Sequence, residues 1–254
     1  MSAALEICAL EGLPEVSEGD RLGELIAASA RDGGFDLADE NVVVVSQKVV
    51  SKAEGRVRHL GRVEPGERAR RLAAELGKDP RLVELVLAES ERVVRAERGV
   101  LIVETRGGVV CANAGIDASN VPGADAVTLL PVDADASARR IRTELATTCG
   151  KRPAVVVADS LGRPWRLGQA EVAIGCAGLV ALDDWRGRAD TEGRELAATV
   201  VAIADEIAAA ADLARDKSSR TPAVLVRGTG RWRTDADGSG AAALRRPPAE
   251  DLFR

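Results

Sequence analysis

Apolar residues along this chain follow two different periods, and each period predicts its own kind of element. Unbroken β-branched runs, such as residues 42–45, are typical of strands that are covered on both faces. Strands bounded by turn residues are predicted at 5–10, 42–45, 93–94, 100–103, 109–110, 154–157 and 223–226. Helical spacing of apolar residues predicts helices at 20–30, 65–92 (broken at Asp79-Pro80), 135–148 and 193–213.

The order of these elements predicts the fold class. The strands between residues 93 and 110 follow one another through glycine turns, which predicts an antiparallel meander. The other strands do not alternate regularly with helices, and the sequence contains neither GxxxxGK(S/T) nor GxGxxG after a strand. We therefore predict a mixed α/β (α+β) fold, with antiparallel elements in mixed sheets packed by helices, and neither a Rossmann nor a P-loop fold.

The composition is that of a globular protein, because 46% of the 254 residues are hydrophobic and 30% are charged. The net charge of −5 and the aromatic content of 2% disfavour nucleic-acid binding, which uses basic surfaces and stacking aromatics. No apolar run approaches the roughly 20 residues of a membrane span, and the first residues lack the pattern of a signal peptide. The sequence predicts a cytoplasmic protein without nucleic-acid or membrane partners.

Histidine and cysteine chemistry is nearly excluded. His59 is the only histidine, so neither a histidine-based triad nor a histidine-rich metal site is expected. The four cysteines form no CxxC pair and lie among apolar residues, which predicts buried free thiols. An enzyme built from this sequence must work with carboxylates, lysine, arginine, hydroxyls and a metal.

Two short segments carry the most distinctive chemistry. Residues 113–120 and 159–166 each follow an apolar run and combine glycine with Asp, Asn or Ser, as in a strand that ends in a binding loop. An Asp there presents hard oxygen ligands that suit Mg²⁺ or Mn²⁺, and two such loops could converge on one metal–phosphate site. Two Asx turns are the alternative interpretation. Arg163, Trp165 and Arg166 form either an anion clamp or a surface turn.

Lys48 and Lys52 directly follow the buried strand at 42–45. They are expected either to reach phosphates from the strand end or to form a solvated basic loop. Asp205 and Glu206 are adjacent in a predicted helix, where consecutive side chains point about 100° apart. One of the two is therefore expected in solvent and the other buried near a base such as Arg227.

These segments resemble the signature blocks of the coenzyme F420 gamma-glutamyl ligases (coenzyme F420-0:L-glutamate ligases). The blocks that carry the resemblance are 49–56, 113–120 and 159–169. Shorter similar blocks occur in the family order at 12–14, 193–196, 204–211, 226–228 and 251–253. The resemblance implies one ligase domain over residues 1–254, or two intertwined subdomains, without the C-terminal reductase-like domain of larger relatives.

The resemblance implies a GTP-dependent acid–amino-acid ligase of coenzyme F420 biosynthesis. Such an enzyme joins the amino group of L-glutamate to the carboxylate on the phospholactyl arm of the deazaflavin precursor, coenzyme F420-0, and later adds γ-glutamyl links. Activation of that carboxylate as an acyl phosphate is the simplest route. The implied cations are two Mg²⁺ or Mn²⁺ ions, with K⁺ as a further candidate, and the implied assembly is a homodimer. A metal-dependent phosphohydrolase and a non-catalytic nucleotide- or deazaflavin-binding module are the alternatives.

Matching positions imply the site residues. The metal ligands are Asp117, Asp159 and Ser160, and the catalytic residues are Asp117, Asp159 and Arg166. The nucleotide contacts are Leu13, Pro14, Glu15, Val16, Gln47, Lys48, Lys52, Asn120 and Lys217. Three positions depart from the family pattern: Ser160 replaces a usual threonine, Gln47 stands where serine is common, and residues 215–220 lack the usual glycine.

Overall fold

The computed structural model describes residues 4–119, 121, 123, 125–215 and 218–251. Two residues that we predict to contact nucleotide, Asn120 and Lys217, lie outside the described residues. Among the described residues, no helix is long and apolar enough to cross a membrane.

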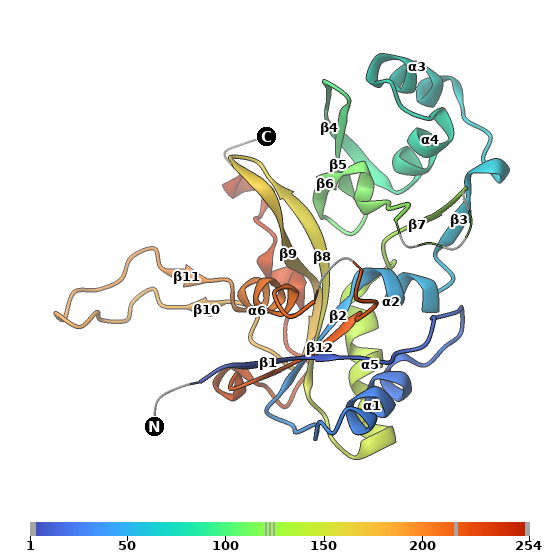
Figure 1. Ribbon diagram of the computed structural model, residues 1–254. Helices are drawn as coiled ribbons and strands as arrows, with labels where there is room; N and C mark the ends of the chain where they lie inside the picture. The colour runs from blue at the N-terminus through green and yellow to red at the C-terminus, as the bar shows by residue number, and fades with distance from the viewer. Residues whose placement is uncertain (1–3, 120, 122, 124, 216–217, 252–254) are drawn as a thin grey trace.

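A five-stranded sheet forms the centre of the molecule (Figure 1). Its strands, in the order β1-β12-β2-β8-β9, are β1 (Glu6–Leu10), β12 (Ala223–Arg227), β2 (Val42–Ser46), β8 (Ala154–Arg163) and β9 (Arg166–Ala177). β2 and β8 pair in parallel, whereas the other neighbours are antiparallel. This mixed sheet, packed by helices, confirms the predicted α+β class.

The other elements have the following bounds. The helices are α1 (Leu22–Asp32), α2 (Gln47–Ala53), α3 (Glu67–Leu76), α4 (Pro80–Ala88), α5 (Ala134–Cys149) and α6 (Ile203–Asp212). The further strands are β3 (Val57–His59), β4 (Ser90–Glu97), β5 (Val100–Thr105), β6 (Val110–Ala112), β7 (Ala126–Thr128), β10 (Asp183–Asp184) and β11 (Val200–Val201). Short 3-10 turns are η1 (Leu60–Arg62), η2 (Asn113–Gly115), η3 (Gly230–Trp232), η4 (Ala241–Leu244) and η5 (Pro248–Glu250).

Helices cover both faces of the central sheet. Val43 and Val45 are fully buried on the face packed by α1 and α5, and Val42 and Val44 are buried on the face packed by α6. β2 is therefore covered on both sides, as its unbroken β-branched run predicts. α2 begins at the residue after β2, so the chain passes from a buried strand directly into a helix at one end of the sheet.

A smaller unit stands beside the central sheet (Figure 1). Its strands β4, β5 and β6 form an antiparallel meander, which confirms that prediction. α3 and α4 pack on it through a separate core that includes Val83, Val86, Leu101 and Val103. The break at residue 79 is also confirmed, because Asp79 caps α4 by accepting a hydrogen bond from the Arg81 backbone N–H at 2.8 Å.

Three predicted elements are wrong in extent. The helix predicted from residue 193 begins only at Ile203, because residues 185–199 form a projecting arm between β10 and β11 (Figure 1). In that arm, the residues with helical spacing face solvent and have no core to pack on. They form no helix there, because most helices in proteins are stabilised by packing of their apolar face. The helical segment at 65–92 gives way to strand β4 at Ser90, and the strand predicted at 154–157 continues to Arg163.

All four cysteines are free, as predicted. Cys111 and Cys176 are buried and Cys8 is partly buried. The prediction of burial is wrong for Cys149, which is exposed in the last turn of α5, where that helix leaves the core.

Candidate active site

Lys48, in the first turn of α2, reaches the predicted metal-binding segment. Its Nζ lies 2.7 Å from Asp117 Oδ2 and donates hydrogen bonds to the Ser119 carbonyl and hydroxyl oxygens at 2.6 and 2.7 Å. The Lys48 side chain is only 16% exposed, whereas that of Asp117 is 46% exposed. Helix α2 thus places a largely buried ammonium group against a carboxylate that remains open to solvent.

Backbone contacts fix Asp117 in place. Asp117 and Thr128 exchange backbone hydrogen bonds of 3.1 and 2.8 Å. The preceding turn holds Asn113, Ala114 and Gly115 at φ values of 52°, 55° and 68°, a left-handed conformation that costs energy for residues with a Cβ. Such strain concentrates at functional sites.

The Asx-turn interpretation of this segment is correct, but it is incomplete. The Ser119 backbone N–H donates to Asp117 Oδ1 at 2.7 Å, which is an Asx turn. The other carboxylate oxygen of Asp117 binds Lys48. Burial raises the pKa of Asp117, but the hydrogen bonds from Lys48 and Ser119 outweigh burial and hold that pKa below its ordinary value.

Asp159 faces the same cluster. Burial, followed by the nearby charge of Glu171, raises the pKa of Asp159 to about 7; the charge of Asp117 raises it further and that of Lys48 lowers it. Asp159 is therefore within electrostatic range of both Lys48 and Asp117. The structure brings the two predicted segments together.

The prediction that Asp159 and Ser160 lie in a loop is wrong. Both lie inside β8, which pairs with β9 beyond a register shift at Val157 and Ala158. Consecutive residues of a strand point to opposite faces, so Asp159 and Ser160 cannot serve the same position on one face.

Ser160 contacts a buried pair, Glu171 and Arg215, that the sequence does not single out, and Glu171 is also close enough to Asp159 to raise its pKa. The Ser160 hydroxyl donates to Glu171 Oε1 at 2.5 Å, and Glu171 Oε2 lies 3.1 Å from Arg215 Nη2. The side chains of Glu171 and Arg215 are only 5% and 7% exposed. A lone acid inside the apolar run of β9 was the available signal for Glu171, but only the register of β8 and β9 places it opposite Ser160.

Lys52 is not part of a solvated basic loop. It lies one helical turn after Lys48 in α2, its side chain is only 9% exposed, and it forms an ion pair with Glu15. Glu15 belongs to the predicted nucleotide segment Leu13, Pro14, Glu15 and Val16, so this pair holds that segment against α2.

Gln47 is buried beside this cluster, and Arg166 lies apart from it. Gln47 is 2% exposed, and its amide group donates to Ser51 Oγ and the Leu129 carbonyl. Arg166 is exposed at the tip of the β8–β9 hairpin and pairs with Arg163, which lies roughly 13 Å along the strand from Asp159 at about 3.3 Å per residue. Their assignments to nucleotide and catalysis stay predictions.

The prediction for Asp205 and Glu206 is partly right. Glu206 is exposed and Asp205 is half-buried. Arg227 is not the partner of Asp205, because Arg227 pairs with Glu6 at 3.0 Å. Asp205 instead accepts a hydrogen bond from the Ala173 backbone N–H at 2.9 Å.

The donors in this cluster suit a hard divalent cation. Asp117 and Asp159 offer carboxylate oxygens, and Mg²⁺ is commonly bound by one or two carboxylates together with substrate phosphates. Among the described residues, no three His, Cys, Asp or Glu side chains form a metal-binding group on their own. The two aspartates therefore fit a cation whose remaining ligands come from a bound phosphate.

Comparison with known proteins adds an independent result. Residues 12–228 match the family described as F420-0:Gamma-glutamyl ligase. The chain is 42% identical to the coenzyme F420:L-glutamate ligase of Methanothermobacter thermautotrophicus, over 98% of this chain and 99% of that protein. It is 45% identical to the protein of the same name from Haloarcula marismortui, over 98% of this chain and 96% of that protein.

Proposed function

Because the chain belongs to the F420-0:Gamma-glutamyl ligase family, we propose that it uses GTP to add L-glutamate to coenzyme F420-0. The observation that carries this proposal is the ion pair of Lys48 with Asp117, a cation for phosphate beside a carboxylate for a metal, with Asp159 near enough for both charges to act on its pKa. We place this reaction in the cytoplasm, where GTP is available.

The proposed reaction has two balanced steps. In the first, a carboxylate oxygen of coenzyme F420-0 attacks the γ-phosphorus of GTP, which gives an acyl phosphate and GDP. In the second, the amine of L-glutamate attacks the acyl carbon, inorganic phosphate leaves and the nitrogen loses a proton. The product is an amide, and later rounds on the new γ-carboxylate give γ-glutamyl links.

Five residues have a defined part in this proposal. Lys48 and Lys52 bind phosphate oxygens, so Lys48 would exchange Asp117 for phosphate when GTP arrives. Asp117 and Asp159 would hold one Mg²⁺ or Mn²⁺ ion, and Ser160, on the other face of β8, would contribute to a second. These ions, with K⁺ as a further cation, neutralise phosphate charge, which supplies much of the catalysis in phosphoryl transfer.

We also propose that the enzyme is a homodimer. The arm between β10 and β11 extends away from the body (Figure 1), and the β8–β9 tip leaves Trp165 72% and Leu167 96% exposed. Exposed apolar side chains on projecting segments are typical of association surfaces. Light scattering at micromolar concentration tests this proposal, and a monomer would contradict it.

Mass spectrometry of the products tests the proposed function. The purified protein is incubated with coenzyme F420-0, GTP, Mn²⁺ and L-glutamate, and the precursor should gain one or more glutamyl residues while GDP accumulates. GDP without a glutamylated product would instead indicate a phosphohydrolase. Binding of GTP without GDP formation would indicate a non-catalytic binding module.

A further inference from the structure

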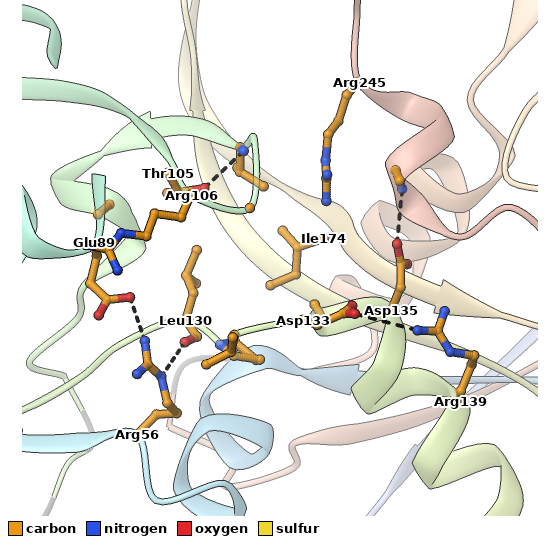
Figure 2. Close-up of a pocket in the computed structure, with 17 residues that line it drawn as sticks. Arg56, Glu89, Thr105, Arg106, Leu130, Asp133, Asp135, Arg139, Ile174 and Arg245 are labelled. Carbon is orange, nitrogen blue, oxygen red and sulfur yellow. Dashed lines mark hydrogen bonds and ion pairs between the residues drawn. The ribbon is translucent and has the colours of Figure 1, made fainter. Parts of the chain in front are cut away.

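A cleft of about 470 Å³ lies between the central sheet and the smaller unit (Figure 2). Its walls come from the turn between β5 and β6, the start of α5, strand β9 and the segment after η4. A second hollow of about 260 Å³ shares Val109, Ile174 and Arg245 with it, so the two adjoin. The volume lies in the range of small-molecule sites, roughly 300–1,000 Å³.

Of the four described acidic side chains that line the two hollows, Glu89 and Asp133 form ion pairs, whereas Asp135 and Asp205 accept hydrogen bonds from backbone N–H groups. Glu89 pairs with Arg56 at 2.5 Å, and Asp133 lies 3.6 Å from Arg139 and also caps α5 (Figure 2). Asp135 accepts hydrogen bonds from the backbone N–H groups of Cys176 and Ala241 at 2.8 and 2.7 Å. Glu89 and Asp133 are therefore neutralised by their own arginines, whereas Asp135, and Asp205 in the second hollow, have no cationic partner among the described residues.

Among the described residues, three arginines that line the two hollows lack an ionic partner, against two carboxylates that also lack one. In the part of the chain that the structure describes, Arg106, Arg245 and Arg246 form no ion pair. Arg245 extends across the cleft from the segment after η4 (Figure 2), and a Cβ added to Gly108 would lie 3.2 Å from Arg245 Cδ. The β5–β6 turn and the chain after η4 thus both bring positive charge to the cleft, and Arg245 lies against that turn.

The floor of the cleft is apolar and leads to the candidate active site. Ile174 and Val109 line both hollows. Val172 lines the second hollow and is the direct cross-strand neighbour of Asp159. Ala114, which lines the first hollow, lies three residues before Asp117. A ligand in the cleft would therefore have one end close to the two aspartates.

We propose that this cleft binds the phosphodiester- and carboxylate-bearing arm of the deazaflavin acceptor, with Arg106, Arg245 and Arg246 holding its anionic groups. This inference rests on the proposed function, and it assigns the cleft as the place where the acceptor of the ligase reaction binds. GTP does not suit the cleft, because Glu15, Lys48 and Lys52 lie outside it. L-Glutamate has a net charge of only −1 and only two methylene groups to cover the floor.

Acceptor binding in the absence of GTP tests this inference. The double variant Arg106→Ala/Arg245→Ala is titrated with coenzyme F420-0, whose binding is followed by the fluorescence of its deazaflavin ring. Each arginine removed should raise the Kd by roughly tenfold. The double variant Arg106→Lys/Arg245→Lys keeps both charges and should regain part of the affinity, because lysine lacks only the planar fork.

A matched control and two further ligands make the result specific. Arg68→Ala/Arg71→Ala removes two exposed charges from α3, outside the cleft, and should leave the acceptor Kd unchanged. The affinities for GTP and for L-glutamate, measured by calorimetry, should be the same in the cleft variant and the wild type. Circular dichroism should show the same fold.

The outcomes separate this inference from the proposed function. If the cleft variant binds coenzyme F420-0 as tightly as the wild type, or loses L-glutamate affinity instead, the inference is overturned even where the wild type forms product. If the wild type binds coenzyme F420-0 through these arginines but forms no amide, the proposed function fails and the inference holds.

Discussion

Lys48 and Asp117 are 69 residues apart in the chain and meet through an ion pair of 2.7 Å. The pair joins the first turn of α2 to the strained turn before Asp117. The Lys48 ammonium group neutralises the Asp117 carboxylate that we expect to hold a metal, so this ion pair carries no net charge before any ligand binds. Substitutions in it should therefore act on ligand binding and turnover more than on folding.

Asp117→Ala should abolish glutamylation with the fold intact. The side chain is 46% exposed, so its removal leaves no buried cavity, but it removes a hard ligand from the metal–phosphate site. Product formation by mass spectrometry and the circular dichroism spectrum check both parts. Asp117→Asn, which keeps the size, is the matched variant. Wild-type rates in either variant at ordinary Mg²⁺ concentration would contradict the metal assignment.

Asp159→Ala should abolish turnover in the same way, whereas Ser160→Ala should leave partial activity. The charges of Asp117 and Lys48 act on the pKa of Asp159, whereas Ser160 points to the other face of β8 and bonds to Glu171. The comparison uses kcat at saturating GTP and Mn²⁺. An equal and complete loss in both variants would show that the two residues act at one position, contrary to the strand geometry.

Lys52→Ala should weaken GTP binding, and Glu15→Gln should not. Both changes break the same ion pair, but only the first removes the cation proposed to hold phosphate. Lys52 is largely buried, so its removal should also lower the melting temperature, whereas Glu15 is 65% exposed and its change should not. Calorimetric titration with GTP measures the difference. Unchanged GTP affinity in Lys52→Ala would remove Lys52 from the nucleotide site.

Asp205→Asn should make the protein more stable at neutral pH. Burial raises the pKa of Asp205 above its ordinary value, although the Ala173 N–H bond opposes that rise. The Asp205 carboxylate then binds its proton more tightly in the folded protein than in the unfolded chain. Wild-type stability therefore falls as the pH rises from the pKa in the unfolded chain, about 3.9, through the raised pKa in the folded protein. The asparagine keeps the acceptor oxygen without the charge. Plotted against pH, the melting temperatures of the wild type and the variant should coincide below that pH window and diverge above it. A constant difference at every pH would contradict the raised pKa of Asp205.

Local pattern predicts the parts of this molecule whose structure depends on neighbours in sequence. The unbroken valines of β2 and the Asp79-Pro80 helix break required only their own segments. By contrast, the inclusion of Asp159 in β8 depends on pairing with β9, and the approach of Glu171 to Ser160 depends on register. Arg245 reaches its cleft only because η4 packs beside β9, which no spacing in the sequence indicates.

Metal and GTP should strengthen each other's binding. The oxygens of Asp117 and Asp159 suit Mg²⁺ and Mn²⁺, but without phosphate they form an incomplete ligand set, so the metal alone should bind weakly. GTP without metal would bring its negative charge against the same two carboxylates, with only the lysines of α2 to offset it.

This coupling can be measured directly, because linkage requires each ligand to tighten the other by the same factor, on the order of 5–150-fold for typical coupling energies. Calorimetric titrations of GTP with and without Mn²⁺, and of Mn²⁺ with and without GTP, should give the same ratio. Asp117→Asn should reduce that ratio, because it removes one of the two charges that GTP must face and that the metal neutralises. Equal GTP affinities in the two conditions would falsify the shared site.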